Sequence, residues 1–276
     1  MYDLMFDAVQ GLLPTREVQS FKGTYGRIAI IAGNEEMGGA GILASSSALY
    51  SGAGLVTTYT APCNHAALHA RLPEAMVKDW QLLIQHADTL ANYNVILIGP
   101  GLGINEFSTL LVSQVIQEAT PEQVLIMDAS AIRIWAELDF PTINSQVVFT
   151  PHLGEFSAIS SIEIEQITLE NSRLFLEEKA PHGILVLKSH ETKIVTSVDC
   201  WRNTLGNPGM AIGGTGDVLA GMIAGFTPQT NSLLDAVKSA VYTHSYIGDL
   251  IACKEHIVLP SRLIEKIPET MYTLFH

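Results

Sequence analysis

The stretch that points most directly to the fold of this chain is Val95-Ile96-Leu97-Ile98-Gly99-Pro100-Gly101-Leu102-Gly103. Four consecutive apolar residues are typical of a strand buried on both faces, because a half-exposed strand alternates apolar and polar residues. The glycines predict a tight turn at the carboxyl end of the strand, where open α/β sheets bind ligands. A plain strand-to-helix turn without a ligand is the alternative. In either case the stretch indicates a parallel sheet covered by helices.

The same pattern recurs along the chain and alternates with segments of helical spacing. Further short apolar runs predict strands at Arg27–Ala32, Leu55–Tyr59, Val124–Met127, Val147–Phe149 and Ile184–Leu187. Between the strands, apolar residues recur every three or four positions, as in Phe107-Leu110-Leu111-Val115 and Ile164-Ile167-Leu174-Phe175. This alternation predicts an α/β fold with a doubly wound, mostly parallel sheet and helices on both faces.

The two ends of the chain depart from this alternation. Glu191–Thr196 and Cys200–Asn203 predict a short antiparallel excursion at the edge of the sheet. Three helices are then expected, at Asp217–Phe226, Leu233–Ile251 and Ser261–Phe275. We expect the first 20 residues to form a helix packed on the outside. Because the sequence shows no linker-like tract and no internal repeat, residues 1–276 are expected to form a single domain.

The composition excludes several classes of protein. Hydrophobic residues make up 47% of the 276 residues, which is far more than disordered chains contain. The 28 acidic and 15 basic residues give a net charge of −13, so we expect no nucleic acid partner. The sequence has no uncharged apolar run of about 18 residues and no signal peptide, so we expect no membrane partner and a cytoplasmic location. Three scattered cysteines give no disulfide framework.

The strongest local signal is the pentapeptide Gly213-Gly214-Thr215-Gly216-Asp217, which opens an apolar helix. Glycines at a helix start present unpaired backbone N–H groups to an anion without a Cβ in the way, so this loop predicts a phosphate site. A carboxylate beside a phosphate suits a general base that deprotonates a hydroxyl for attack on a phosphoryl group. Capping of the helix by Asp217 is the equally open alternative.

Three other segments follow predicted strands at the same edge. Gly33–Gly41 is close to a phosphate-binding loop of the Walker type but lacks its Lys and Ser/Thr, so we expect a loop that contacts a substrate. His152 follows the strand that ends at Phe149 and is either a ligand contact or an ordinary hydrogen-bonded residue. Lys188 ends another strand and either meets a phosphate or extends its amine into solvent.

The order of these motifs along about Phe21 to Leu263 resembles the ADP/ATP-dependent NAD(P)H-hydrate dehydratases, also described as the YjeF C-terminal domain family. Residues 1–20 then form an N-terminal extension. The motifs that carry the resemblance are Lys22–Gly26, Gly38–Ala40, Gly99–Gly103, Met127–Ala129, Thr150–Glu155, Leu187–Lys188, Gly206–Ala211 and Gly213–Asp217.

The resemblance implies a ribokinase-like fold and a lyase that repairs damaged cofactor. The family dehydrates the (6S) hydrates of NADH and NADPH, here called NADHX and NADPHX, to NADH and NADPH. Bacterial members use ADP and release AMP and phosphate, eukaryotic members use ATP, and Mg²⁺ accompanies the nucleotide. The resemblance also implies a homo-oligomer, a homotetramer in the family, and an NAD(P)HX epimerase as functional partner. Some members carry that epimerase as a fused domain, and this chain resembles the stand-alone form.

The resemblance also carries roles onto matching residues. Asp217 would be the general base, and the anion hole would be Gly213, Gly214, Thr215 and Gly216. Contacts to the hydrated dinucleotide would be Ala40, Gly101, Gly103, His152 and Asp217. Contacts to the adenine nucleotide would be Lys188, Ser189, His190, Glu191, Thr192 and Gly216, with Asn207 and Glu155 in support. Ser189 replaces a glycine that is usual in the family, and the metal ligands are not assigned.

Two rival functions stay open at this point. The first is a small-molecule kinase of the same fold that acts on a vitamin-precursor alcohol, such as a hydroxyethylthiazole or hydroxymethylpyrimidine kinase. The second is a protein that binds a dinucleotide without catalysis. The fate of the phosphate distinguishes the enzymes, because a kinase leaves phosphate on its product and the dehydratase releases it.

Overall fold

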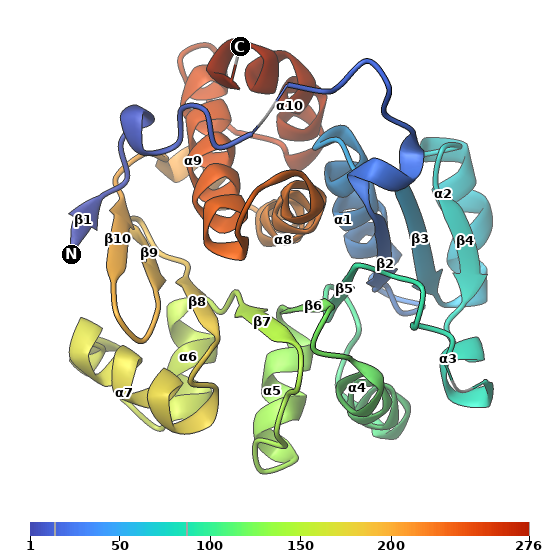
Figure 1. Cartoon of the computed structure of the whole chain (residues 1–276). Coiled ribbons are helices and arrows are strands. Elements are labelled where there is room, and N and C mark those ends of the chain that lie inside the picture. The colour runs from blue at the N-terminus through green and yellow to red at the C-terminus, as the bar shows by residue number, and fades with distance from the viewer. Residues whose placement is uncertain (14, 87, 276) are drawn as a thin grey trace.

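A computed structural model describes residues 1–13, 15–86 and 88–275, and one ten-stranded sheet runs through it (Figure 1). The strand order is β1-β10-β9-β8-β7-β6-β5-β2-β3-β4. Pairing is parallel except between β8 and β9 and between β9 and β10, which form the predicted antiparallel excursion. The bounds are β1 (Tyr2–Asp3), β2 (Arg27–Ile31), β3 (Leu55–Thr60), β4 (Met76–Asp79), β5 (Val95–Ile98), β6 (Val124–Met127), β7 (Gln146–Phe149), β8 (Ile184–Leu187), β9 (Thr192–Val195) and β10 (Cys200–Asn203).

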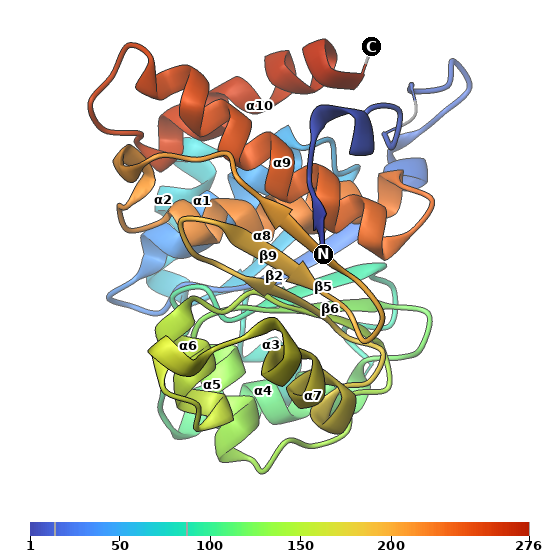
Figure 2. The ribbon, with the colours of Figure 1, turned by 90° about the vertical axis from the view of Figure 1, so that its left-hand side faces the viewer.

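Helices cover both faces of the sheet, as predicted (Figure 2). One layer holds α1 (Gly38–Tyr50), α2 (His65–Arg71), α8 (Thr215–Phe226), α9 (Leu233–Ala252) and α10 (Pro260–Phe275). The other layer holds α3 (Leu82–Gln85), α4 (Glu106–Glu118), α5 (Ser130–Glu137), α6 (Leu153–Ser160) and α7 (Leu169–Lys179). Successive residues of β2 enter opposite cores, Ile28 and Ile30 one of them and Ala29 and Ile31 the other. This two-sided burial explains why the strands are apolar throughout.

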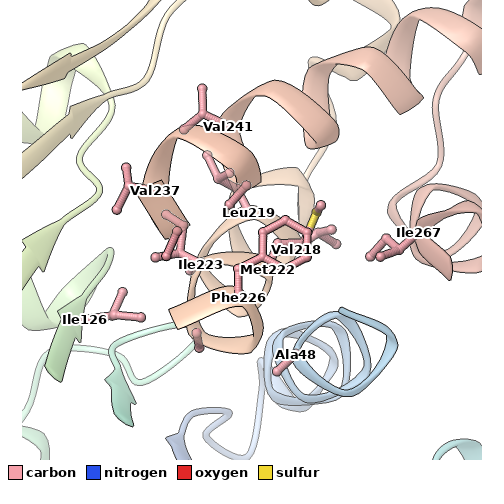
Figure 3. Packing of buried hydrophobic residues seen from close by; sticks show 14 of the residues in the cluster. Ala48, Ile126, Val218, Leu219, Met222, Ile223, Phe226, Val237, Val241 and Ile267 are labelled. Atoms are coloured by element: carbon pink, nitrogen blue, oxygen red, sulfur yellow. The ribbon is translucent and has the colours of Figure 1, made fainter. Parts of the chain in front are cut away.

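Helix α8 is the most deeply buried helix element of the first layer, and it carries the glycine-rich loop at its start. Its side chains pack between Ile126 of the sheet, α9, α10 and Ala48 of α1 (Figure 3). A Cβ on Gly221 would lie 2.3 Å from the backbone oxygen of Ala44, so α1 and α8 approach too closely for any other residue there. Because α8 is apolar on all sides, packing fixes where its N-terminus lies.

The chain winds outward in two directions from neighbouring strands β2 and β5. The loops that leave these two strands are joined by hydrogen bonds, from the Gly33 N–H to the Pro100 oxygen (2.9 Å) and from the Asn34 N–H to the Gly101 oxygen (2.7 Å). In doubly wound sheets such a switch point is where ligands bind. Two of the glycine turns singled out in the sequence therefore meet at the expected place.

The predicted N-terminal helix is wrong. Tyr2 and Asp3 extend the sheet beside β10, a short 3-10 turn spans Phe6–Ala8, and no helix follows among residues 9–13 and 15–21. This irregular segment is anchored in the core by three buried side chains, those of Leu4, Val9 and Leu13. The N-terminus is thus a strand-and-turn segment held by the sheet edge.

The helix expected from Ile164 to Phe175 is also corrected. Residues Ile164–Gln166 form a separate 3-10 turn, and α7 begins at Leu169 after Thr168, whose hydroxyl accepts the Asn171 N–H (3.3 Å). The supposed apolar stripe is not buried as one face, since Leu174 is 57% exposed. In α4 the predicted Leu110 is likewise exposed, while Leu111 and Val115 are buried. No helix in the described part of the chain has the length and apolar character needed to cross a membrane.

Candidate active site

The glycine-rich loop forms an amide cradle at the start of α8. Gly214 precedes the helix with φ +96°, and a Cβ there would lie 2.5 Å from Leu43 Cδ1, so glycine is required. The Thr215 N–H reaches the Ile212 oxygen at 3.4 Å. For the N–H groups of Gly213, Gly214, Gly216 and Asp217, the described residues offer no acceptor. Unpaired amides at a helix N-terminus favour an anion there.

Asp217 lies in the first turn of α8 and does not cap it. The residue before the helix is Gly214, and no side-chain hydrogen bond caps the N-terminus, so the capping alternative is wrong. Burial is the main cause that raises the pKa of Asp217 from 3.8 to about 6. The charges of Asp128 and Glu155 also raise it, and that of Lys188 partly opposes them. A carboxylate in this state is a stronger base than an exposed one yet still ionised at neutral pH.

Lys188 does not extend its amine into solvent. Its Nζ lies 2.8 Å from Asp128 Oδ1, and its side chain is 19% exposed. Burial would lower the pKa of Lys188, but the charges of Asp128, Glu155 and Asp217 together outweigh burial and raise it. A Cβ on Gly216 would lie 3.1 Å from Nζ, so this cation stands beside the amide cradle. The structure brings together the lysine, the loop and the carboxylate that the sequence placed far apart.

Asp128 is the acidic partner that orders this lysine. It follows β6 directly, its side chain is 2% exposed, and Oδ1 also accepts the Thr150 hydroxyl at 2.7 Å. The next residue, Ala129, has φ +46°, a conformation that costs a non-glycine residue free energy. A buried carboxylate on a strained turn at a strand end is typical of a site residue. The Met127–Ala129 motif contained it, but sequence analysis assigned it no role.

His152 and Glu155 form a reciprocal cap on α6. His152 Nδ1 accepts the Glu155 N–H at 3.1 Å, and Glu155 Oε2 accepts the His152 N–H at 2.8 Å. The ordinary structural role of His152 is therefore confirmed. Its side chain is nevertheless 60% exposed at the carboxyl edge of the sheet, and its backbone pairs with Lys188. A contact between His152 and a substrate stays a prediction.

Three of the residues predicted for the dinucleotide, Ala40, Gly101 and Gly103, lie at the switch point. A Cβ on Gly101 would lie 2.7 Å from the Cβ of Ala40, and one on Gly103 would lie 2.8 Å from Asn34 Nδ2. Asn64, which sequence analysis did not single out, holds this corner: its Nδ2 donates to the Gly33 and Asn34 oxygens, both at 3.0 Å. An isolated asparagine carries no sequence signal for such a role, because its partners are 30 residues away in the chain.

The predicted nucleotide contacts lie on the turn between β8 and β9. The Ser189 hydroxyl donates to the Glu191 oxygen at 2.7 Å and accepts the Glu191 N–H at 3.2 Å, and Thr192 Oγ1 reaches the Ser189 oxygen at 3.3 Å. The serine in place of the usual glycine thus closes the turn, and His190 is exposed at its tip. In the neighbouring loop, Asn207 accepts the Gly209 N–H and donates to Asp249 at 2.9 Å.

The fold and the site together define a nucleotide-dependent enzyme of the ribokinase-like class. A family model described as NAD(P)H-hydrate dehydratase matches residues 28–269. The chain belongs to this NAD(P)H-hydrate dehydratase family, whose members are lyases. The resemblance inferred from the motifs is thereby confirmed, and so is the ribokinase-like fold class.

Known proteins similar to this chain agree with that assignment. The ADP-dependent (S)-NAD(P)H-hydrate dehydratase of Staphylococcus aureus is 42% identical over 262 residues, which cover 95% of this chain and 94% of the relative. A crystal structure of a ribokinase-like superfamily protein from Enterococcus faecalis has a TM-score of 0.95 at 38% identity and covers 99% of this chain and 96% of its own. The ADP/ATP-dependent NAD(P)H-hydrate dehydratase from Bacillus subtilis, co-crystallised with ATP and Mg²⁺, has a TM-score of 0.87 at 30% identity, covering 99% and 98%.

More distant proteins bear on the rival function and on the partner. Hydroxyethylthiazole kinase from Pyrococcus horikoshii has a TM-score of 0.58 at 14% identity, a likeness that shows the fold alone. The bifunctional NAD(P)H-hydrate repair enzyme of Coxiella burnetii is 34% identical over 252 residues, which cover 90% of this chain and 50% of that protein. The kinase alternative is thus the weaker one.

Proposed function

We propose that Asp217 is the general base of an ADP-dependent dehydration of the (S) hydrates of NADH and NADPH. The observation that carries this proposal is a partly buried carboxylate with a pKa raised to about 6, standing beside four unpaired amides at a helix start. Such a base accepts a proton from a hydroxyl, while the amides receive the phosphoryl group that the hydroxyl attacks. The family membership of the chain supplies the reaction class.

The proposed reaction converts a poor leaving group into a good one. Asp217 removes the proton from the C6 hydroxyl of the hydrate, and the oxygen attacks the terminal phosphoryl group of ADP, so that AMP leaves. The lone pair of the ring nitrogen then expels phosphate from C6. Loss of a proton from C5 restores the dihydropyridine ring. The sum is hydrate plus ADP giving NADH or NADPH, AMP and phosphate.

We assign the remaining predicted residues to the two substrates by their place in the fold. Ala40, Gly101 and Gly103, at the switch point, and His152, at the carboxyl end of β7 beside Lys188, are proposed to contact the hydrated dinucleotide. Lys188, Gly216 and the turn Ser189–Thr192 are proposed to contact ADP. The proximity of Lys188 Nζ to the Gly216 backbone supports a shared role on the phosphates. Glu155 and Asn207 support the site by ordering α6 and the loop before the anion hole.

We further propose that Mg²⁺ enters with the nucleotide. Within residues 1–13, 15–86 and 88–275, no three His, Cys, Asp or Glu side chains are grouped so as to hold a metal ion by themselves. Mg²⁺ typically uses one or two carboxylates together with substrate phosphates, and the oxygens near the cradle are of that type. Asp128 already pairs with Lys188 and Glu155 with the His152 N–H, so we propose that the substrate phosphates supply most of the ligands of this ion. When bound, the ion would neutralise phosphate charge.

Several broader assignments are proposals of the same kind. The bifunctional Coxiella burnetii relative supports an NAD(P)HX epimerase as functional partner. The homo-oligomer, a homotetramer in the family, rests on the resemblance. The continuous sheet supports a single domain over residues 1–276. A cytoplasmic location follows from the proposed substrates, because NAD(P)H and ADP are metabolites of the cell interior.

The test measures the absorbance of reduced nicotinamide with purified protein, the hydrate of NADH, Mg²⁺, and either ADP or ATP. We expect a rise that requires nucleotide, is matched by released phosphate, and fails when Mg²⁺ is omitted. The Asp217→Asn variant should show no rise. Phosphate retained on the product would favour a kinase instead, and turnover by Asp217→Asn at a rate near that of the parent would overturn the role of Asp217.

A further inference from the structure

A buried histidine of α9 contacts the backbone of the anion loop. His244 is 6% exposed, and its Nε2 lies 3.1 Å from the backbone oxygen of Thr215, the first residue of α8. A carbonyl oxygen only accepts hydrogen bonds, so Nε2 carries the proton and donates it. The contact spans 29 residues of sequence and joins two helices that pack side by side.

This hydrogen bond acts on the peptide group that supplies one of the unpaired amides. The Thr215 oxygen and the Gly216 N–H belong to the same planar, trans peptide, so they point in opposite directions. Holding the oxygen toward His244 therefore aims the Gly216 N–H away from α9. Gly216 itself borders the cradle, since a Cβ on it would lie 3.1 Å from Lys188 Nζ.

His244 is suited to this contact because it stays uncharged. Burial is the main cause that lowers the pKa of His244 from 6.5 to about 4, and the charge of Lys188 acts in the same direction. The hydrogen bond to Thr215 opposes this shift but does not outweigh it. The ring is thus a neutral donor over the whole range near pH 7, and it brings no second cation close to Asp217.

Helix α9, which carries His244, also holds the segment that leads into the anion loop. Asp249 accepts the Gly206 N–H at 3.0 Å and the Asn207 side-chain N–H at 2.9 Å. A Cβ on Gly248 would lie 2.2 Å from the sulfur of Met210, so the loop packs directly on the α9 backbone. The loop is therefore fixed to α9 before the cradle by Asp249 and within it by His244.

We propose that His244 is a positioning residue for the anion hole, acting through the Thr215–Gly216 peptide. This inference rests on the proposed role of the unpaired amides at the start of α8 and adds to it the element that orients one of them. Removing the donor leaves only the helix bond to hold this peptide oxygen, and misplacement by about 1 Å can cost about a hundredfold in rate. Because the amide is needed most as charge moves during phosphoryl transfer, the loss should fall on kcat more than on KM.

The experiment compares His244→Leu, His244→Gln and His244→Asn in the full chain. Leucine removes the donor, the glutamine amide nitrogen can occupy the place of Nε2, and asparagine is one methylene too short. Thr243→Val is the matched control: it is a neighbouring buried residue of α9 whose hydroxyl has no partner in the described structure. Each variant is assayed for kcat, for KM of ADP and hydrate, and for Tm.

We expect kcat to fall by about ten- to a hundredfold in His244→Leu, with KM for ADP within about threefold of the parent. His244→Gln should recover to within about fivefold, and Thr243→Val should match the parent. A folded His244→Leu with kcat within twofold of the parent, or equal losses in the Gln and Leu variants, would overturn the proposal. If His244→Leu does not fold, equal kcat in the Gln and Asn variants would overturn it.

Asp217→Asn, assayed in parallel, separates this inference from the function on which it rests. An inactive Asp217→Asn beside a fully active His244→Leu refutes only the role of His244. An active Asp217→Asn refutes the proposed base and with it the chemistry that the anion hole is meant to serve.

Discussion

Asp217→Asn is expected to abolish turnover while making the folded protein more stable at neutral pH. Asparagine keeps the shape of the side chain but has no charge to bury and cannot accept the proton. Loss of a general base costs at least about a hundredfold in rate. The stability effect has the opposite sign, because the folded state holds the ionised carboxylate at a cost that the unfolded chain does not have.

The size of the gain follows from the raised pKa of Asp217. A shift from 3.8 to about 6 means that protonation stabilises the folded state relative to the unfolded one. Well below pH 3.8 the carboxyl is protonated in both states, and the folded chain bears no penalty. As the pH rises, the penalty grows to about 1.5 kcal/mol at pH 5 and about 3 kcal/mol at pH 8. Asp217→Asn removes this penalty, so its advantage should increase with pH over that range.

The assay is urea unfolding of the parent and the variant at equal protein concentration from pH 5 to pH 8. Glu163→Gln, which removes one charge from an exposed position, is the control and should change stability by less than about 0.5 kcal/mol. A stability difference that does not vary with pH would refute the reasoning, and so would an Asp217→Asn variant that is less stable than the parent at pH 8. Either result would mean that the carboxylate is well solvated or well paired in the folded protein.

Three further predictions concern the surroundings of Asp217. Asp128→Asn should move the acid limb of the kcat–pH profile below about pH 6, since the charge of Asp128 helps to raise the pKa of Asp217; an unmoved limb would contradict the coupling. Lys188→Met should raise the KM for ADP at least about tenfold while the KM for the hydrate changes little. The double variant Lys188→Met/Asp128→Asn should regain stability, but its KM for ADP should stay high. A KM for ADP equal to that of the parent would leave Lys188 a purely structural role. Gly214→Ala should destabilise the fold by about 1–3 kcal/mol because of its φ of +96°, as measured by urea unfolding. Gly213→Ala, whose Cβ meets nothing within 4 Å, should leave stability nearly unchanged, and equal losses would refute this account.

The parallel strands that sequence analysis found are those with both faces buried. Val95–Ile98, Val124–Met127 and Ile184–Leu187 are predicted to the residue, because two-sided burial leaves a continuous apolar run. β4 at Met76–Asp79 was missed because it lies at the edge of the sheet. None of its four residues is buried and half of them are polar, so it leaves no continuous apolar run. The N-terminal segment misled the analysis because its apolar residues serve a strand and a turn, and short irregular segments have no periodicity to detect.

The candidate site was predicted in part. Glycines that open an apolar helix identify Gly213–Asp217 without any knowledge of the fold, since the physical cause is local. The pairing of Lys188 with Asp128 could not be predicted in that way, because it depends on which strands lie close in the sheet. Both residues directly follow predicted strands, so the available signal was their position at the carboxyl edge of the sheet. His244 gave none: a histidine within a mostly apolar helix has the same pattern whether or not it touches the site.

The charges of the site explain why amides, with few cations, would hold the phosphate. Asp128, Glu155 and Asp217 surround Lys188, and its pairing with Asp128 uses part of its charge. A further lysine near the cradle would stabilise ionised Asp217 and lower its pKa, which would weaken the proposed base. Backbone dipoles and a neutral His244 stabilise an anion with less effect on that carboxylate. The loop thus reconciles two demands that oppose each other, strong binding of a negative group and a carboxylate that stays basic beside it.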